Sequence, residues 1–299
     1  MGNRIKPYLW AVLYLALLLL MLTPFNFLAL SVLLVPLLIL SVTLDAKRFS
    51  LCLAALCVLP FVFLQSLGLI TLVLTLFFAV PAVVMGSLYK KQKSAIAVTT
   101  SGILTVLGVM VAGFAVSGLL GFDFGRTLAD LVEETMKNLP DASKAMLPRD
   151  YIDQLSDLII QLIPLYMIAG SFYFVTIGHT LTRRILKRQN VELPKVRPFK
   201  DWMLPRSLVF YYLVGMIANL FIPADDHNST MAVILINLMP LLNFAFCVQA
   251  FSFLCFVADL KKWNKVWLVL GLAAVIFFPP LSLLGVFDTA FPIRQRLKN

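Results

Sequence analysis

Charge is what this sequence of 299 residues has least of. Asp, Glu, Lys and Arg together make up 13% of the chain, whereas apolar residues make up 61%. Soluble domains average roughly 25% charged and 45–50% apolar residues. Because so few charges cannot cover a surface in contact with water, the composition excludes a soluble globular protein. It predicts an all-α, polytopic membrane protein.

Reactive side chains are scarce as well. His179 and His227 are the only histidines, and no His-x-x-x-His, Glu-x-x-His, Gly-x-Ser-x-Gly or Walker sequence occurs. A catalytic centre or a metal site therefore has few groups to use. The four cysteines form no Cys-x-x-Cys pair and lie in apolar runs, which is typical of buried small side chains. We expect no enzyme, no metal and no cofactor.

Long apolar runs mark the membrane spans. A bilayer core about 30 Å thick needs roughly 17–25 apolar residues per helix. Eight runs of about this size occur, at residues 8–24, 27–44, 50–66, 69–89, 95–119, 158–181, 208–223 and 231–258. A ninth run, 266–291, is interrupted by Pro279-Pro280, and this pair removes two backbone donors. The sequence therefore predicts a helix bundle of eight or nine spans.

The loops between these runs separate by charge. With the N-terminus in the cytoplasm, the cytoplasmic loops hold eighteen Lys and Arg against four Asp and Glu, and the opposite loops hold four against ten. This asymmetry predicts a cytoplasmic N-terminus. The basic tail, with Arg294, Arg296 and Lys298, obeys the same rule if the proline pair makes a re-entrant pair of half-helices. A single kinked span with an external basic tail is the alternative.

Two long loops divide the chain. Residues 122–157 are acidic with apolar residues at helical spacing, which indicates either amphipathic helices on the outer membrane surface or a lid over a cavity that opens outward. Residues 182–206 form a basic cytoplasmic loop. We therefore predict an N-terminal five-span bundle (1–121), an extracytoplasmic amphipathic helical segment (122–157) and a C-terminal bundle (158–299).

The basic loop predicts contact with the bilayer. Anionic headgroups attract basic residues near the surface with about 1 kcal/mol each. Docking of a cytoplasmic or membrane protein is the alternative, and nucleic-acid binding is not expected because the loop shows no recognition fold. The residues on which either contact rests are Arg183, Arg184, Lys187, Arg188 and Trp202.

Neutral polar residues and prolines interrupt the sixth to eighth runs. A proline in a span frees backbone carbonyls, which a neighbouring helix or a cavity must satisfy. The polar side chains either bridge helices by hydrogen bonds or line a cavity for a small-molecule or lipid ligand. The candidate cavity residues are Tyr166, Tyr173, Tyr212, Asn219, Asn237 and Gln249.

One acidic residue, Asp288, lies within an apolar run. A proton- or sodium-coupled pump usually keeps a carboxylate in the bilayer, so Asp288 is the one candidate for such coupling. Pro292 breaks the helix between Asp288 and Arg294, which allows the arginine to fold back towards the carboxylate. We predict a structural ion pair between them rather than a coupling site.

Several short motifs follow one another along the chain. They are the turn Asp45-Ala-Lys-Arg48, the segment Gly86-Ser-Leu-Tyr-Lys-Lys-Gln-Lys93, Phe199-x-x-Trp202-x-x-Pro205, Asn237 with Gln249, and Gly285-x-x-Asp288 followed by Arg294. Their order resembles the YybS-like family of bacterial predicted membrane proteins, a domain family of unknown function. This resemblance implies a bacterial cytoplasmic membrane.

The N-terminal half of such proteins is similar to the substrate-binding S-components of energy-coupling-factor vitamin transporters. This similarity implies a cavity among the helices and ATPase-driven partners. The first span departs from the S-component pattern, with Ala11 and Ala16 five apart instead of small residues three apart.

Together these features predict a transport-related membrane protein of S-component-like fold that binds a small or amphiphilic solute among kinked helices. The alternative is a non-transporting membrane scaffold or regulator that recruits a partner protein.

Overall fold

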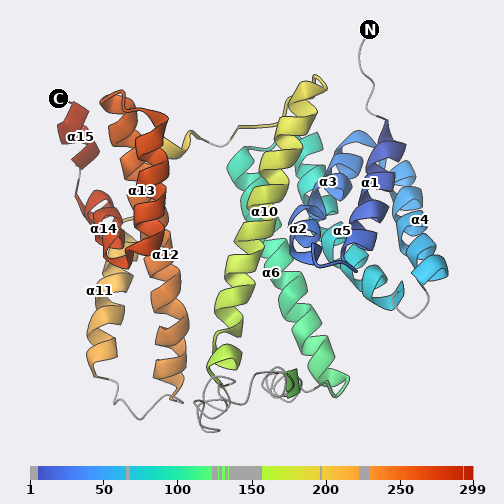
Figure 1. Cartoon of the computed structure of the whole chain (residues 1–299), viewed down its shortest axis with the longest axis horizontal. Coiled ribbons are helices and arrows are strands. Elements are labelled where there is room, and N and C mark those ends of the chain that lie inside the picture. The colour runs from blue at the N-terminus through green and yellow to red at the C-terminus, as the bar shows by residue number, and fades with distance from the viewer. Residues whose placement is uncertain are drawn as a thin grey trace. The chain divides into compact units, whose positions relative to one another are not determined.

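The computed structural model describes residues 6–64, 68–122, 127, 130–131, 134, 157–195, 197–221, 229–291 and 293–298. Regular secondary structure in these residues is helical throughout, which confirms the all-α class. The helices form two compact units, coloured along the chain in Figure 1. Unit 1 comprises Met1–Phe124 and Met167–Val196, and unit 2 comprises Gly125–Tyr166 and Arg197–Asn299.

Unit 1 is built around α3 (Leu34–Thr43), a short helix that is apolar on every side. Each residue of this helix from Leu34 to Ser41 is buried, as expected of a helix enclosed by others. It packs against α1 (Pro7–Leu20), α4 (Ala46–Leu64) and α5 (Gly68–Lys90). The helices of unit 1 are α1 (Pro7–Leu20), α2 (Asn26–Val32), α3 (Leu34–Thr43), α4 (Ala46–Leu64), α5 (Gly68–Lys90), α6 (Ala95–Leu119) and most of α10 (Ile163–Arg188).

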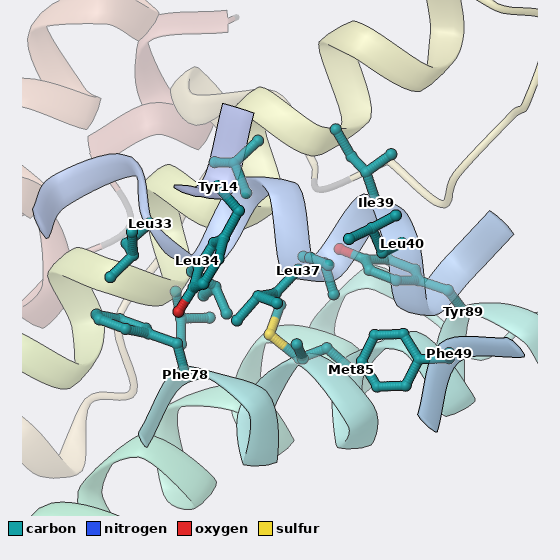
Figure 2. Close-up of a cluster of buried hydrophobic side chains, with 14 of the residues drawn as sticks. Tyr14, Leu33, Leu34, Leu37, Ile39, Leu40, Phe49, Phe78, Met85 and Tyr89 are labelled. Atoms are coloured by element: carbon teal, nitrogen blue, oxygen red, sulfur yellow. The ribbon is translucent and has the colours of Figure 1, made fainter. Parts of the chain in front are cut away.

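Figure 2 shows the core of this unit, where leucines of α3 meet Tyr14 of α1 and Phe78 and Met85 of α5. The Tyr14 hydroxyl donates to Thr75 Oγ1 at 3.1 Å, so the one polar atom of this buried ring has a partner. Val175 and Leu186 of α10 belong to the same core. Close packing of these large side chains holds the helices of the unit together.

The second apolar run folds as two helices rather than one. Leu33 separates α2 from α3, and its N–H bonds the Leu30 carbonyl in a tighter turn. Pro36 has no N–H to offer the carbonyl of Val32, which explains why the regular helix is interrupted one turn before the proline. The interruption lies beside the groove described below.

Unit 2 is built around α12 (Thr230–Leu260), the longest of its described helices. The helices α11, α13 and α14 and the turn η2 all contact α12. The elements of unit 2 that follow α10 are η2 (Phe199–Asp201), α11 (Ser207–Leu220), α12 (Thr230–Leu260), α13 (Lys265–Phe277), η3 (Pro279–Leu281), α14 (Ser282–Ala290) and α15 (Ile293–Lys298).

The ninth run breaks at Pro279-Pro280, and the chain then reverses. Gly271 of α13 lies beside Leu254 of α12, whereas Gly285 of α14 lies beside Phe246, so the chain first descends along α12. It then climbs again, because Asp288 reaches Gln249 and the following arginine reaches Ser252. Figure 1 shows α15 at the end of unit 2 where α12 ends and α13 begins.

This path is that of a re-entrant pair of half-helices. At 1.5 Å per residue, α13 is about 20 Å long and α14 about 13 Å, so neither alone crosses a core of roughly 30 Å. The basic tail therefore lies at the same end of unit 2 as the loop that contains Lys200. The chain thus reverses direction at the proline pair, as the re-entrant alternative requires, and the position of this hairpin in the membrane stays a prediction.

Four stretches are long and apolar enough to cross a membrane by length and composition: Asn26–Thr43, Gly68–Lys90, Ala95–Leu119 and Thr230–Leu260. Shorter apolar helices are Pro7–Leu20, Ser207–Leu220 and Val266–Val275. A helix also occupies the described part of every predicted run. The protein is thus a multi-pass helical membrane protein, and the count of eight or nine spans stays a prediction.

The boundaries of the units differ from the predicted division at residue 158. Residues 167–196 pack with the N-terminal helices, because the apolar face of α10 completes their core. The predicted segment 122–157 lies outside the described residues, apart from a few isolated positions. Apolar periodicity shows where a helix runs, but it does not show which neighbours the helix has.

Candidate functional site

An apolar groove with a volume of about 690 Å³ lies in unit 1 between α1, α2 and α10. Leucines of α1 and α2 form two of its walls, and α10 forms the third with Tyr173, Thr176 and Thr180. These three residues lie at positions i, i+3 and i+7, so one face of α10 places three hydroxyl-bearing residues along the groove. Sequence reasoning included Tyr173 but missed Thr176, although its helical spacing was a usable signal.

One hydrogen bond at the groove has a defined direction. Ser31 Oγ donates to the carbonyl of Phe27 at 2.6 Å, and its distance to the Tyr173 hydroxyl is 2.7 Å. A serine hydroxyl has one proton, so Tyr173 is the donor of the second bond. Its own oxygen keeps lone pairs that can accept a hydrogen bond. The Tyr173 ring is held against Phe174, with centroids 5.5 Å apart.

The groove is neutral and its surface is almost entirely apolar. Its lining residues are aliphatic, apart from the hydroxyl groups of Ser31, Tyr173, Thr176 and Thr180, and none carries a formal charge. Volumes of 300–1,000 Å³ are typical of small-molecule pockets. Such a site can bind a hydrocarbon chain together with an uncharged polar group, but it offers no cation for a phosphate or carboxylate.

Asn237 uses its side chain to bridge helices within unit 2. Its Oδ1 accepts from the Leu165 N–H at 3.0 Å, and its Nδ2 donates to the carbonyls of Gln161 and Val233 at 2.7 and 2.9 Å. These contacts span the break at residue 162, where Pro164 prevents a continuous helix. Of the two roles open to Asn237, the contacts are those of a helix bridge.

The six predicted cavity residues do not form one group. Tyr173 lies in unit 1, whereas the others lie in unit 2. Tyr166 and Asn219 are exposed, and the ring of Tyr212 packs edge-on against Phe246 with centroids 5.3 Å apart. Gln249 belongs to a different cluster, which contains both predicted partners of the C-terminal ion pair.

That cluster is centred on Asp288, whose side chain is fully buried. Arg294 donates to it through Nε, at 3.0 Å from both carboxylate oxygens, and through Nη2, at 2.6 Å from Oδ2. Gln249 Nε2 donates to the same Oδ2 at 2.6 Å. The ion pair predicted from the Pro292 break is thus present, and an amide from α12 completes it.

The same groups hold the segment 199–204 against α12. Arg294 also donates to the Lys200 carbonyl and to Ser252 Oγ, and Gln249 Oε1 accepts from the Leu204 N–H at 3.1 Å. Ser252 in turn donates to the Phe199 carbonyl at 2.7 Å, and the Trp202 carbonyl lies 3.1 Å from the same hydroxyl. A buried ion pair is tolerated when hydrogen bonds satisfy its remaining atoms, as they do here. The cluster therefore joins α12, α14, α15 and the basic loop.

A second ion pair fixes the loop from the solvent side. Lys200 Nζ lies 2.5 Å from Asp259 Oδ2, at the end of α12. The hydrogen bond to Asp259 raises the pKa of Lys200 above its ordinary value. Because both groups are exposed, the pair adds little to stability. Its main effect is on where the loop lies.

The predicted docking residues fall on both units. Arg184, Lys187 and Arg188 are exposed on the last turns of α10, and Arg183 is half-buried there. Trp202 lies in unit 2, where its indole N–H donates to the Arg197 carbonyl at 3.0 Å. The α10 bases thus belong to unit 1 and Trp202 to unit 2.

One buried polar contact was not anticipated. The Tyr89 hydroxyl hydrogen-bonds His179 Nδ1 inside unit 1, and the two rings stack with centroids 5.9 Å apart. Tyr89 lies within the motif of residues 86–93, but 90 positions separate it from His179. Nothing in a single sequence pairs residues so far apart.

Apolar helices with largely exposed faces, a re-entrant hairpin and buried polar clusters define a helical integral membrane protein. Comparison with known proteins supports the same class of protein. The family described as "Predicted membrane protein (DUF2232)" matches residues 9–289, from α1 to α14. The chain belongs to this family, which confirms the resemblance seen in its motifs.

Among curated proteins, the uncharacterized protein YybS of Bacillus subtilis (strain 168) is 22% identical over 231 residues, which is 74% of each chain. No solved structure matches the chain.

Proposed function

We propose that this protein is a transport-related protein of the bacterial cytoplasmic membrane whose S-component-like N-terminal unit binds an amphiphilic molecule in the groove between α1, α2 and α10. The observation that carries the proposal is the row of hydroxyl-bearing residues on α10 along an otherwise apolar groove.

The groove favours an uncharged polar group attached to a hydrocarbon chain. Aliphatic walls gain roughly 25 cal/mol for each Å² of apolar surface that a ligand covers. Tyr173, already bonded to Ser31, can accept one hydrogen bond from a hydroxyl or amide of the ligand. Because no lining residue is basic, an anionic headgroup would lose its hydration without gaining a partner.

The groove can be tested by filling it. In the Thr176→Trp variant, an indole would occupy the groove, whereas in Phe172→Trp it would stand at an exposed neighbouring position that is not among the lining residues. Full-length protein is extracted in mild detergent, and co-purified small molecules are measured by native mass spectrometry. We expect wild type and Phe172→Trp to retain an amphiphile and Thr176→Trp to lose at least nine-tenths of it.

Removing a single hydroxyl refines the same test. Tyr173→Phe keeps the ring but loses the hydrogen bond, which is worth about 0.5–1.5 kcal/mol, and should weaken retention roughly two- to tenfold. Equal retention by all variants would count against the groove as the site. The transport role is tested separately, by reconstituting wild type and Thr176→Trp in vesicles and following movement of the identified molecule between the two sides.

A scaffold or regulator is the second candidate, and the exposed bases on the last turns of α10 favour it. Reversing Arg184, Lys187 and Arg188 to glutamate should reduce recovery of a co-purifying cytoplasmic partner at least tenfold, because the partner would then meet like charges. Lys91→Glu with Lys93→Glu, at the exposed end of α5, is the matched control. Unchanged recovery in the α10 variant contradicts this candidate.

A further inference from the structure

Basic and aromatic side chains from three separate segments gather at one end of unit 2. The segments are the loop that precedes α11, the turn between α12 and α13, and α15, and Figure 1 shows the last two at the same end of the unit. They are brought together by the buried cluster, since Arg294 of α15 bonds the Lys200 carbonyl and Lys200 pairs with Asp259 at the end of α12.

The exposed charges of these segments are mostly positive. Lys261 and Lys262 on the turn and Arg296 on α15 are all exposed. Asp259 is already paired with Lys200, Asp288 is buried against Arg294, and the exposed Asp201 lies near Lys200. The three exposed bases therefore outnumber the one exposed acid that remains, and they attract anions.

Tryptophans stand next to these bases, where apolar helices end. Trp263 and Trp267 are 43% and 61% exposed, and their ring centroids are 6.5 Å apart. Farther along α13, Val269 and Leu270 are exposed as well. Tryptophan and lysine above an apolar helix surface are typical of the level of lipid headgroups, where the ring lies among the headgroups and the aliphatic residues contact acyl chains.

We propose that Lys261, Lys262, Trp263, Trp267 and Arg296 form a platform that binds the phosphate headgroups of anionic phospholipids. An acidic protein would be attracted by the same charges, but it would not require the apolar surface of α13 directly beneath them. A phospholipid satisfies both features with one molecule. The C-terminal tail enters this platform through the re-entrant hairpin, which explains why a basic tail follows a broken span.

The test compares two lipids on the full-length protein. Purified protein is titrated with dioleoylphosphatidylglycerol or with dioleoylphosphatidylcholine, and bound lipid is counted by native mass spectrometry. We expect tighter binding of the glycerol lipid. The variant Lys261→Gln, Lys262→Gln, Arg296→Gln should lose roughly fivefold in affinity for each charge removed, or about a hundredfold in all, with little change for the choline lipid.

The matched control removes three exposed charges from unit 1, with Lys47→Gln, Lys91→Gln and Lys93→Gln. It should keep the wild-type preference. An equal loss in both variants would show that net charge, rather than the platform, governs binding. Absence of a preference in wild type also overturns the proposal. So does a platform variant that binds the glycerol lipid normally but loses an acidic protein partner. Circular dichroism and thermal unfolding verify that both variants fold.

Discussion

Replacing Arg294 with methionine is expected to lower the free energy of unfolding by about 3–5 kcal/mol, because the change leaves a buried carboxylate without its counter-ion. Asp288 has no exposed surface, and Arg294 supplies three of the four hydrogen bonds that it accepts in the structure. Gln249 would remain as a neutral donor. The measurement is thermal unfolding of the detergent-extracted protein, together with the yield of folded protein.

A second variant tests whether the charges of Asp288 and Arg294 serve structure or function. Adding Asp288→Asn to Arg294→Met removes the unpaired charge, so most of the lost stability should return. Asp259→Asn breaks the exposed pair with Lys200 and serves as the control, for which we expect less than about 1 kcal/mol. If Arg294→Met instead folded with wild-type stability but lost the bound amphiphile, the charge would serve function, and the structural interpretation would be wrong.

Much of the fold was predictable because it follows from local patterns in the sequence. Apolar runs located the helices, and the missing N–H groups of Pro279-Pro280 located the break between α13 and α14. The short separation of Asp288 and Arg294 likewise made their pairing predictable. Such features depend on residues within a few turns of one another, so one sequence is enough to find them.

The remaining features depend on contacts between distant residues. Gln249 approaches Asp288 across 39 positions, and Asn237 approaches Gln161 across 76. Polarity in a span indicates only that a partner is needed, and a helix bridge and a cavity wall look the same in sequence. The direction of the chain after the proline pair had the same ambiguity. It was decided by the fit of α14 against α12, which no local pattern encodes.

The second large loss of stability is expected at Gly285, which lies in the contact of α14 with α12. A Cβ atom at this position would lie 2.0 Å from the Phe246 carbonyl oxygen and 2.9 Å from the Ala250 nitrogen. Both are backbone atoms of α12, so a rotamer change cannot relieve the clash and α14 must move away. We expect Gly285→Ala to cost about 3 kcal/mol, the upper part of the range for overpacked sites, as measured by thermal unfolding. Gly271→Ala is the matched control, because its nearest neighbour is the flexible end of Leu254 at 3.2 Å.

The effects of Gly285→Ala and Arg294→Met on stability should also be coupled. If Gly285→Ala displaces α14, it carries Asp288 away from Gln249 and weakens the cluster that Arg294 completes. Arg294→Met added to Gly285→Ala should then cost much less than it does alone, by 0.5–3 kcal/mol, as for residues that share one network. The glycine variant should also lose affinity for phosphatidylglycerol, because α15 would no longer be held at the platform. Full additivity of the two losses, with lipid binding intact, would mean that α14 stays in place and that the close approach at Gly285 does not position the tail.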